Sequence, residues 1–216
     1  MWDLPTRLFH WALVALIVLS FVSGQLEVME LHEWSGIVIL GLLVFRVLWG
    51  FFGGTHARFG SFVRGPRAVI AYARNVMKPG AARFAGHNPL GGWSVVLMLA
   101  CLAVQAGSGL FANDDTNFEG PLAGRVSKAT SDFFTHVHHI NLNVLYVLVA
   151  LHVGAVVFYL VKKGENLVRP MVTGYKEWGE AGASGGTGDI EHRGGSTLVA
   201  VILAAIAAAA VYAVIR

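Results

Sequence analysis

Histidines are the residues with the clearest chemical potential in this sequence. The 216-residue chain has nine of them, although 55% of its residues are hydrophobic and only 13% are charged. An imidazole inside a long apolar segment is costly to bury, and such residues mark functional sites by default. Six histidines lie within or at the ends of such segments: His10, His32, His136, His138, His139 and His152. These residues are the first candidates for a metal or cofactor site.

The histidines of the 136–152 segment can be placed on a helix by their spacing. His138 and His152 are 14 residues apart, which leaves their side chains about 40° from the same direction and about 21 Å apart along the axis. The same arithmetic points His139 about 140° away from His152, and His136 about 160° away. Only His138 of this cluster is therefore predicted to face the same side as His152.

Depth in the bilayer predicts a partner for each of these two histidines. His10 is expected level with His152 (the inner pair), and His32 level with His138 (the outer pair). Two imidazoles that face each other can hold a planar metal macrocycle, and a haem iron takes axial ligands on its two sides. This geometry favours two haems, although spacing does not name the cofactor. Cys101 is the only cysteine, which excludes c-type attachment and leaves haem b as the default.

Two other interpretations of the histidines are open at this stage. A single histidine in a membrane helix often only forms hydrogen bonds that hold helices together, although four that pair by depth and by face are harder to explain in this way. A metal-ion transporter would usually add carboxylates near the middle of the bilayer. The middle of every predicted span lacks Asp and Glu, which disfavours transport.

The elements that position the histidines are predicted to be membrane-spanning helices. A span needs about 20 mostly apolar residues, and the backbone must satisfy its own hydrogen bonds in lipid, which favours α-helices. Five segments qualify, approximately Leu8–Gly24, His32–Gly53, Gly92–Ala112, His136–Val161 and Ser196–Ile215. The predicted fold is an all-α integral membrane protein, whose fifth span has no histidine and is expected to pack or anchor. A formal net charge of +3 is too mild to indicate nucleic-acid binding.

The charges of the connecting segments predict the orientation in the membrane. The 54–90 connection has no acidic residue and six basic ones, namely Arg58, Arg64, Arg67, Arg74, Lys78 and Arg83. Basic connections stay on the cytoplasmic side, so the N-terminus is expected in the cytoplasm and the C-terminus, after five spans, in the periplasm. The 113–135 connection then lies outside, and its acidic residues outnumber its basic ones. A stretch reading GASGGTGD at 182–189 predicts a flexible cytoplasmic linker.

Several polar residues near the predicted pairs have more than one possible role. Arg46 comes 14 residues after His32 and so lies about 21 Å deeper, level with the inner pair. It could contact a haem propionate or reach lipid phosphate. His87, in the motif GHNPLGG, could cap the inner haem or shape a quinone site, although a turn with a helix start is the favoured interpretation.

Other residues of the spans are expected mainly to hold the helices together. Hydrogen bonds between helices are the favoured role of Gln105, Ser108, Asn141 and Asn143. Space for a macrocycle or close helix contact could explain Gly36, Gly41, Gly107 and Gly109. Anchoring at the membrane interface is expected of Trp34, Trp49 and Trp93.

Five stretches of the chain combine into a familiar pattern. They are WDLPTRLFHW, LHEWSGIVILGLLVFRVLWGF, HARF, GHNPLGGW and VHHINLNVLYVLVALHV. Together they resemble the bacterial cytochrome b561 family, which includes the cytochrome b subunits of nickel–iron hydrogenases. The resemblance covers about residues 2–175, and it implies a four-helix domain at 1–175 that holds two b-type haems. The linker at 176–195 and the helix at 196–216 lie outside it.

The resemblance also implies ligands and a function. Carried over residue by residue, His10 and His152 would bind the inner haem iron, and His32 and His138 the outer one. The haems of such proteins relay electrons between the membrane quinone pool and a redox partner on the outer face, such as a hydrogenase module or a periplasmic c-type cytochrome. A quinone-linked superoxide oxidase and a membrane-anchoring subunit of a hydrogenase-like complex stay open, and the acidic outer connection argues weakly against the former.

The basic 54–90 connection generates a prediction about orientation. A cysteine introduced near Arg67 should resist membrane-impermeant thiol reagents in intact cells, because this connection is expected in the cytoplasm. A cysteine introduced near Asp115 should react with the same reagents. The parent chain, whose Cys101 lies in mid-span, controls for background labelling. The reverse pattern would invert the orientation and exchange the inner and outer assignments.

Overall fold

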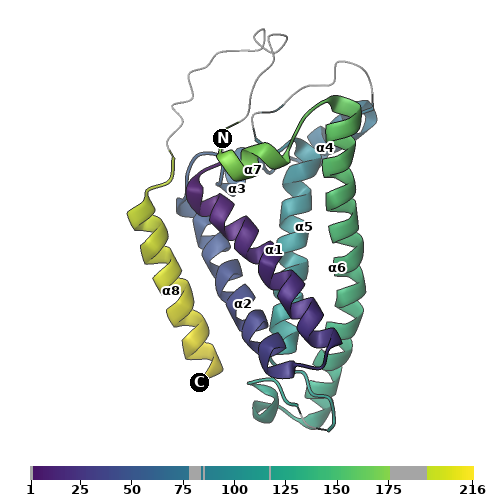
Figure 1. Cartoon of the computed structure of the whole chain (residues 1–216), viewed down its shortest axis with the longest axis vertical. Coiled ribbons are helices and arrows are strands. Elements are labelled where there is room, and N and C mark those ends of the chain that lie inside the picture. The colour runs from purple at the N-terminus through teal and green to yellow at the C-terminus, as the bar shows by residue number, and fades with distance from the viewer. Residues whose placement is uncertain (1, 78–83, 85, 117, 176–193) are drawn as a thin grey trace.

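The part of the chain that the structure describes consists of helices and the segments that connect them (Figure 1). The computed structural model describes residues 2–77, 84, 86–116, 118–175 and 194–216. Besides helices and turns, these residues form one isolated antiparallel bridge, between Asn113 and Glu119. The structure does not describe most of the predicted linker or two residues of the basic connection, Lys78 and Arg83.

Five of the described helices are long and apolar enough to cross a membrane, which confirms the predicted spans and makes the chain a multi-pass membrane protein. They are α1 (Leu4–Gln25), α2 (Met29–Phe52), α5 (Pro89–Gly109), α6 (Lys128–Lys163) and α8 (Thr197–Ile215). The connections contain the shorter helices α3 (Phe59–Phe62), α4 (Pro66–Asn75), η1 (Ala123–Arg125) and α7 (Val168–Thr173).

Helix α6 is longer than its apolar pattern predicts, because it begins at Lys128 rather than near His136. Its first turns are polar, so a search for apolar residues does not include them. Ser127 caps the helix by accepting a hydrogen bond from the backbone N–H of Thr130 at 3.2 Å. The helix ends at Lys163, and the capping residue Gly164 that follows has a left-handed φ of 63°, which is free of strain for glycine. One continuous helix therefore carries a histidine of each predicted pair.

Helix α2 is the most enclosed span. It packs against α1, α5 and α8, and α5 in turn packs against α6 (Figure 1). In its most apolar window 39% of the residues are buried, against 6% to 22% in the other four spans. Lipid is as apolar as a protein core, so the large apolar side chains that remain exposed on the spans are suited to lipid contact.

Helix α8 lies beside α2, outside the four helices of the bundle (Figure 1). Its buried side chains are Ala200, Leu203, Ala207 and Val211. They are spaced three or four residues apart, which places them on one face. Because two of them are alanines, this face allows close approach of the neighbouring helix. The fifth span therefore packs on the bundle, which is the role that its composition predicts.

Trp49 corrects one prediction from the sequence. It was expected at the membrane interface, but its exposed fraction is 0%. Its ring stacks on Phe45 with centres 5.8 Å apart, and its indole N–H donates to Asp3 Oδ1 at 3.4 Å. A Cβ on Gly195 would come within 2.2 Å of the indole, so the segment before α8 lies directly on this ring. Trp34 and Trp93, the other two tryptophans for which this role was predicted, are exposed.

Candidate functional site

The structure brings together the four histidines that spacing and depth select. His10 of α1 faces His152 of α6, with ring centres 6.4 Å apart and ring planes inclined by 50°. His32 of α2 faces His138 of α6, with ring centres 6.1 Å apart and planes inclined by 78°. All four rings are partly buried. Helices that are distant in the sequence thus meet through imidazoles at two levels of the bundle.

The neighbouring histidines of α6 point elsewhere. His136 and His139 are exposed, whereas His138 between them is partly buried. This difference follows from the helical period, which turns each of the two about half a revolution away from the inward face. The structure therefore does not bring His136 or His139 into either pair.

The separation of the rings in each pair fits a shared iron. An imidazole nitrogen binds a metal ion at about 2.0 Å, so two imidazoles on opposite sides of one ion have ring centres about 6.3 Å apart. The observed separations are 6.4 and 6.1 Å. Among the described residues, no group of three or more His, Cys, Asp or Glu side chains is placed to bind a metal ion. Two protein ligands per iron, with a macrocycle completing the coordination, is the arrangement that these residues fit.

Backbone carbonyls orient both imidazoles of the outer pair. His32 Nδ1 lies 2.8 Å from the carbonyl oxygen of Ser20, and His138 Nδ1 lies 2.9 Å from that of Gln105. A carbonyl oxygen can only accept, so each Nδ1 must carry the proton and donate it. Each Nε2 is then left with a free lone pair, which is the state that a metal ligand requires.

Glycines on the facing helices make room for the outer imidazoles. A Cβ on Gly24 would lie 3.0 Å from His32 Nδ1, and a Cβ on Gly109 would lie 3.1 Å from His138 Cε1. Both distances are tighter than an ordinary contact, so a larger residue would displace the ring. By contrast, a Cβ would meet no described atom within 4 Å at Gly36, Gly41 and Gly107.

The inner pair has a different polar environment. His10 Nδ1 is buried and has no hydrogen-bond partner among the described residues. Arg46 of α2 has an exposed fraction of only 3%, and its guanidinium lies 5.1 Å from the centre of the Phe59 ring. A guanidinium that reached lipid phosphate would have to be exposed, so burial excludes that role for Arg46.

His87 lies directly before α5 and packs into the inner end of the bundle. Its ring centre is 4.5 Å from that of Trp2 and 4.9 Å from that of Phe62. Burial, together with the nearby Arg46 and His152, lowers the pKa of His87 to about 4, so this side chain is neutral near pH 7. Asn88 caps α5 through a 2.8 Å hydrogen bond from Gly91 N–H, which confirms a turn and helix start in this motif. The same motif also buries an imidazole beside the inner pair.

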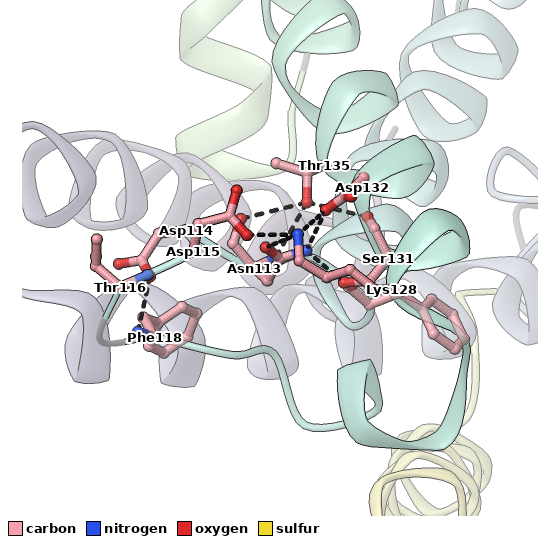
Figure 2. A network of polar contacts seen from close by, with 10 residues as sticks. Asn113, Asp114, Asp115, Thr116, Phe118, Lys128, Ser131, Asp132 and Thr135 are labelled. Atoms are coloured by element: carbon pink, nitrogen blue, oxygen red, sulfur yellow. Dashed lines mark hydrogen bonds and ion pairs between the residues drawn. The ribbon is translucent and has the colours of Figure 1, made fainter.

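A polar network folds the 113–135 connection against the start of α6 (Figure 2). The Lys128 ammonium contacts the carboxylates of Asp115 and Asp132, and it donates to Asn113 Oδ1 at 3.2 Å. The Asn113 backbone N–H donates to Thr135 Oγ1 at 3.0 Å, within one turn of the outer pair. Two of the four carboxylates of this connection are therefore paired with the same ammonium.

The other two acidic side chains of this connection differ in their environment. Asp114 accepts hydrogen bonds from the backbone N–H groups of Thr116 and Phe118, each at 2.9 Å, and so stabilises the turn (Figure 2). Glu119 is exposed. Glu119 is accordingly the carboxylate of this connection that can be changed with least effect on its fold.

Comparison with known families identifies the arrangement of helices and histidines. A model of the family described as prokaryotic cytochrome b561 matches residues 1–174. The chain belongs to this family. Searches among curated proteins and among solved structures gave no match. The match includes α1, α2, α5 and α6, and it ends before α8.

Membership of the cytochrome b561 family gives the paired histidines a chemical context. Members are membrane cytochromes that bind haem b and transfer electrons. The residues present fit that group, because each pair offers two imidazoles at the separation expected across one iron. In the outer pair each Nδ1 also donates to a backbone carbonyl, and metal-bound histidines commonly make such a hydrogen bond.

Sequence reasoning missed the groups that orient the imidazoles. The acceptors are the backbone carbonyls of Ser20 and Gln105, and every residue has such a carbonyl, so no side-chain pattern marks them. Gly24 was also missed. A glycine near the end of a span, opposite a histidine, could have indicated that the imidazole packs closely against that helix. For Gln105, the predicted contact between helices is present as well, because its side-chain oxygen accepts from Asn141 Nδ2 at 2.7 Å.

The two glycines near the end of α5 allow a matched test of the outer pair. Gly109→Ala should push the His138 ring by a few tenths of an ångström, because the new Cβ would lie 3.1 Å from Cε1. Gly107→Ala places its Cβ in open space and serves as the control, because it is the same substitution two residues away in the same helix. We expect the reduced spectrum of one haem to change in Gly109→Ala only. Identical spectra for the two variants would show that the outer ring is not tightly confined.

Proposed function

We propose that the chain carries electrons across the bacterial inner membrane through two b-type haems, between the quinone pool and a periplasmic redox partner. His10 and His152 are the axial ligands of the inner haem, and His32 and His138 those of the outer haem. The observation that carries the proposal is the presence of two imidazole pairs, with ring centres 6.4 and 6.1 Å apart, on helices of one bundle.

The chain contributes ligation, orientation and separation. Haem, when bound, supplies one-electron oxidation and reduction at its iron. Two histidines would hold each iron and would leave no position for substrate, which favours electron relay over oxygen chemistry. The carbonyls of Ser20 and Gln105 hold the outer imidazoles in the tautomer that ligation needs and make Nε2 a stronger donor.

The spacing on α6 supports transfer across the membrane rather than along one surface. His138 and His152 lie on one continuous helix and are separated by about 21 Å along its axis. The hydrocarbon core of a bilayer is about 30 Å thick. Two sites at this separation can lie one near each face of the membrane. An electron then crosses in steps that are shorter than the full thickness of the bilayer.

The orientation and the partners complete the proposal. Arg58, Arg64, Arg67 and Arg74 lie in the described part of the basic connection at the end of the bundle near the inner pair, and the positive-inside rule assigns that end to the cytoplasm. Quinone dissolves in the hydrocarbon and so can reach a helical bundle from its side. A c-type cytochrome or another redox subunit would meet the outer pair from the periplasm.

The alternative activities are less well supported by the described residues. A superoxide oxidase would need a positively charged approach to the outer pair, to attract an anion. Lys128, close to that pair in the sequence, is instead engaged by two carboxylates (Figure 2). An anchoring subunit would need a face for its partner, and in α8 this would have to be another face than the small-residue one, which is buried in this chain.

The ligand assignment can be tested one haem at a time. His138→Ala or His32→Ala should remove the outer haem and leave the inner one, and His152→Ala or His10→Ala should do the opposite. Each ligand belongs to one iron, so the stoichiometry should fall from about two haems per chain to about one. Haem per chain and a low-temperature reduced spectrum measure both effects.

His139→Ala is the matched control for the ligand assignment, because His139 is adjacent to His138 but exposed. It should keep both haems, with at most a shifted potential. If His139→Ala loses a haem while His138→Ala keeps two, the assignment of the outer pair is wrong. A wild-type chain that contains a single haem would contradict the two-site proposal itself.

The periplasmic partner can be tested at Glu119. Complementary charge mainly raises the rate of association, and salt screens it. Glu119→Gln should therefore slow electron exchange with a basic c-type cytochrome at low salt and make the rate less dependent on salt. Asp114→Asn is a poorer variant, because Asp114 also holds the turn. An unchanged rate and salt profile for Glu119→Gln would remove this surface from the docking site.

A further inference from the structure

We propose that Arg46 and His87 form a carboxylate-binding pair that holds the propionate groups of the inner haem. This inference rests on the proposed function, since it presupposes a haem between His10 and His152. It goes further because it gives His87 a specific role and places the carboxylate edge of the inner haem at the end of the bundle where His87 lies.

Arg46 is a buried cation whose hydrogen bonds are incomplete. Its exposed fraction is 3%, and its Nη1 is buried without a partner among the described residues. A buried charge is costly unless an opposite charge and hydrogen bonds compensate it. Asp3 is near enough to interact electrostatically with Arg46, but its Oδ1 accepts from Thr6 N–H and Trp49 Nε1, and its Oδ2 from Gly54 N–H. A second carboxylate would complete the environment of Arg46.

His87 supplies a second donor from a different part of the chain. Its Nδ1 is buried and, within the described structure, has no hydrogen-bond partner. The ring is held between Trp2 and Phe62, with ring centres 4.5 and 4.9 Å away. The position of the imidazole is therefore determined by packing, while its hydrogen-bonding capacity is left unused.

Aromatic rings connect the two donors beside the inner pair. The Arg46 guanidinium lies 5.1 Å from the centre of the Phe59 ring, the Phe59 and Phe62 centres are 5.8 Å apart, and Phe62 contacts His87. His87 is also close enough to Arg46 and His152 for their charges to act on it. The cation of Arg46 and the neutral donor of His87 thus lie near each other. Both are at the level of the bundle where the propionate edge of a haem between His10 and His152 would lie.

The two ends of the bundle differ in a way that points to a ligand at this end. Within the described chain, the buried side-chain atoms that lack a partner are Thr6 Oγ1, Arg7 Nε, His10 Nδ1, Arg46 Nη1 and His87 Nδ1. All five belong to residues at the inner end, whereas the Nδ1 atoms of the outer pair are bonded to carbonyls. Haem b carries two carboxylates, and arginine is the side chain best suited to bind a carboxylate with two parallel hydrogen bonds.

The test uses the intact protein with its haems and replaces each donor in two ways. Arg46→Gln removes the charge, and Arg46→Lys keeps the charge but loses the planar fork. His87→Phe keeps a ring between Trp2 and Phe62 but removes the donor, and His87→Gln restores an N–H donor. The propionate bending bands of the resonance Raman spectrum and the rate of haem transfer to apomyoglobin are measured for each variant.

Arg64→Gln is the control for a general effect of charge. Arg64 lies in the same basic connection, is exposed, and donates to the carbonyl of Ser61 at 2.9 Å. It should match wild type in both measurements. In Arg46→Gln and His87→Phe, one of the two haems should show shifted propionate bands and leave the protein about ten- to a hundredfold faster, since a hydrogen bond to a charged group is lost. His87→Gln should recover part of the wild-type behaviour.

Results that would overturn this inference can be distinguished from results that would overturn the proposed function. Variants that retain two haems with wild-type propionate bands and wild-type transfer rates would overturn this inference and leave the proposed function intact. An effect confined to the outer haem would overturn it too. A wild-type chain without haem would overturn both. If Arg46→Gln does not fold, Arg46→Lys decides, because unchanged propionate bands in that variant would contradict paired hydrogen bonds from Arg46.

Discussion

Both histidine pairs share α6, so the whole arrangement depends on one helix that stays regular between His138 and His152. At 3.6 residues per turn, 14 residues bring the two side chains back to nearly the same face, about 21 Å apart. A single inserted or deleted residue between them would turn one ring away by about 100°. The cap at Ser127 and the stop at Gly164 define a 36-residue helix, which extends beyond both histidines and keeps their surroundings regular.

Polar groups inside an apolar bundle need partners, and the two ends of this bundle provide them differently. At the outer end, backbone carbonyls satisfy the imidazoles, and nearby glycines let the rings approach. At the inner end, two arginines and two imidazoles have buried nitrogen atoms without partners in the described chain. The Nδ1 groups of the outer pair are thus satisfied by the protein itself, whereas the inner end is arranged for a ligand that brings negative charge.

The remaining elements protect these two sites. Helix α2 lies at the centre, and α8 covers part of it with a face of small and aliphatic side chains. Trp49 closes the inner end of α2 against Asp3 and the segment before α8. At the other end, Lys128 and its carboxylate partners attach the 113–135 connection to the first turn of α6 (Figure 2). The acidic residues there serve the fold of the connection first, and only Glu119 is plainly available to a partner.

The sequence by itself determined the number of spans, the histidines that share a face of α6, and the family, because apolar length, helical period and motif spacing are local properties. Only the tertiary structure decided that Trp49 and Arg46 are buried, that His87 lies beside the inner pair, and that the carbonyls of Ser20 and Gln105 orient the outer rings. The physical reason is that lipid and protein interior are equally apolar, so a membrane helix shows little difference between its inward and outward faces. Which side of α2 faces inward, and which backbone groups meet an imidazole, therefore depends on the neighbouring helices.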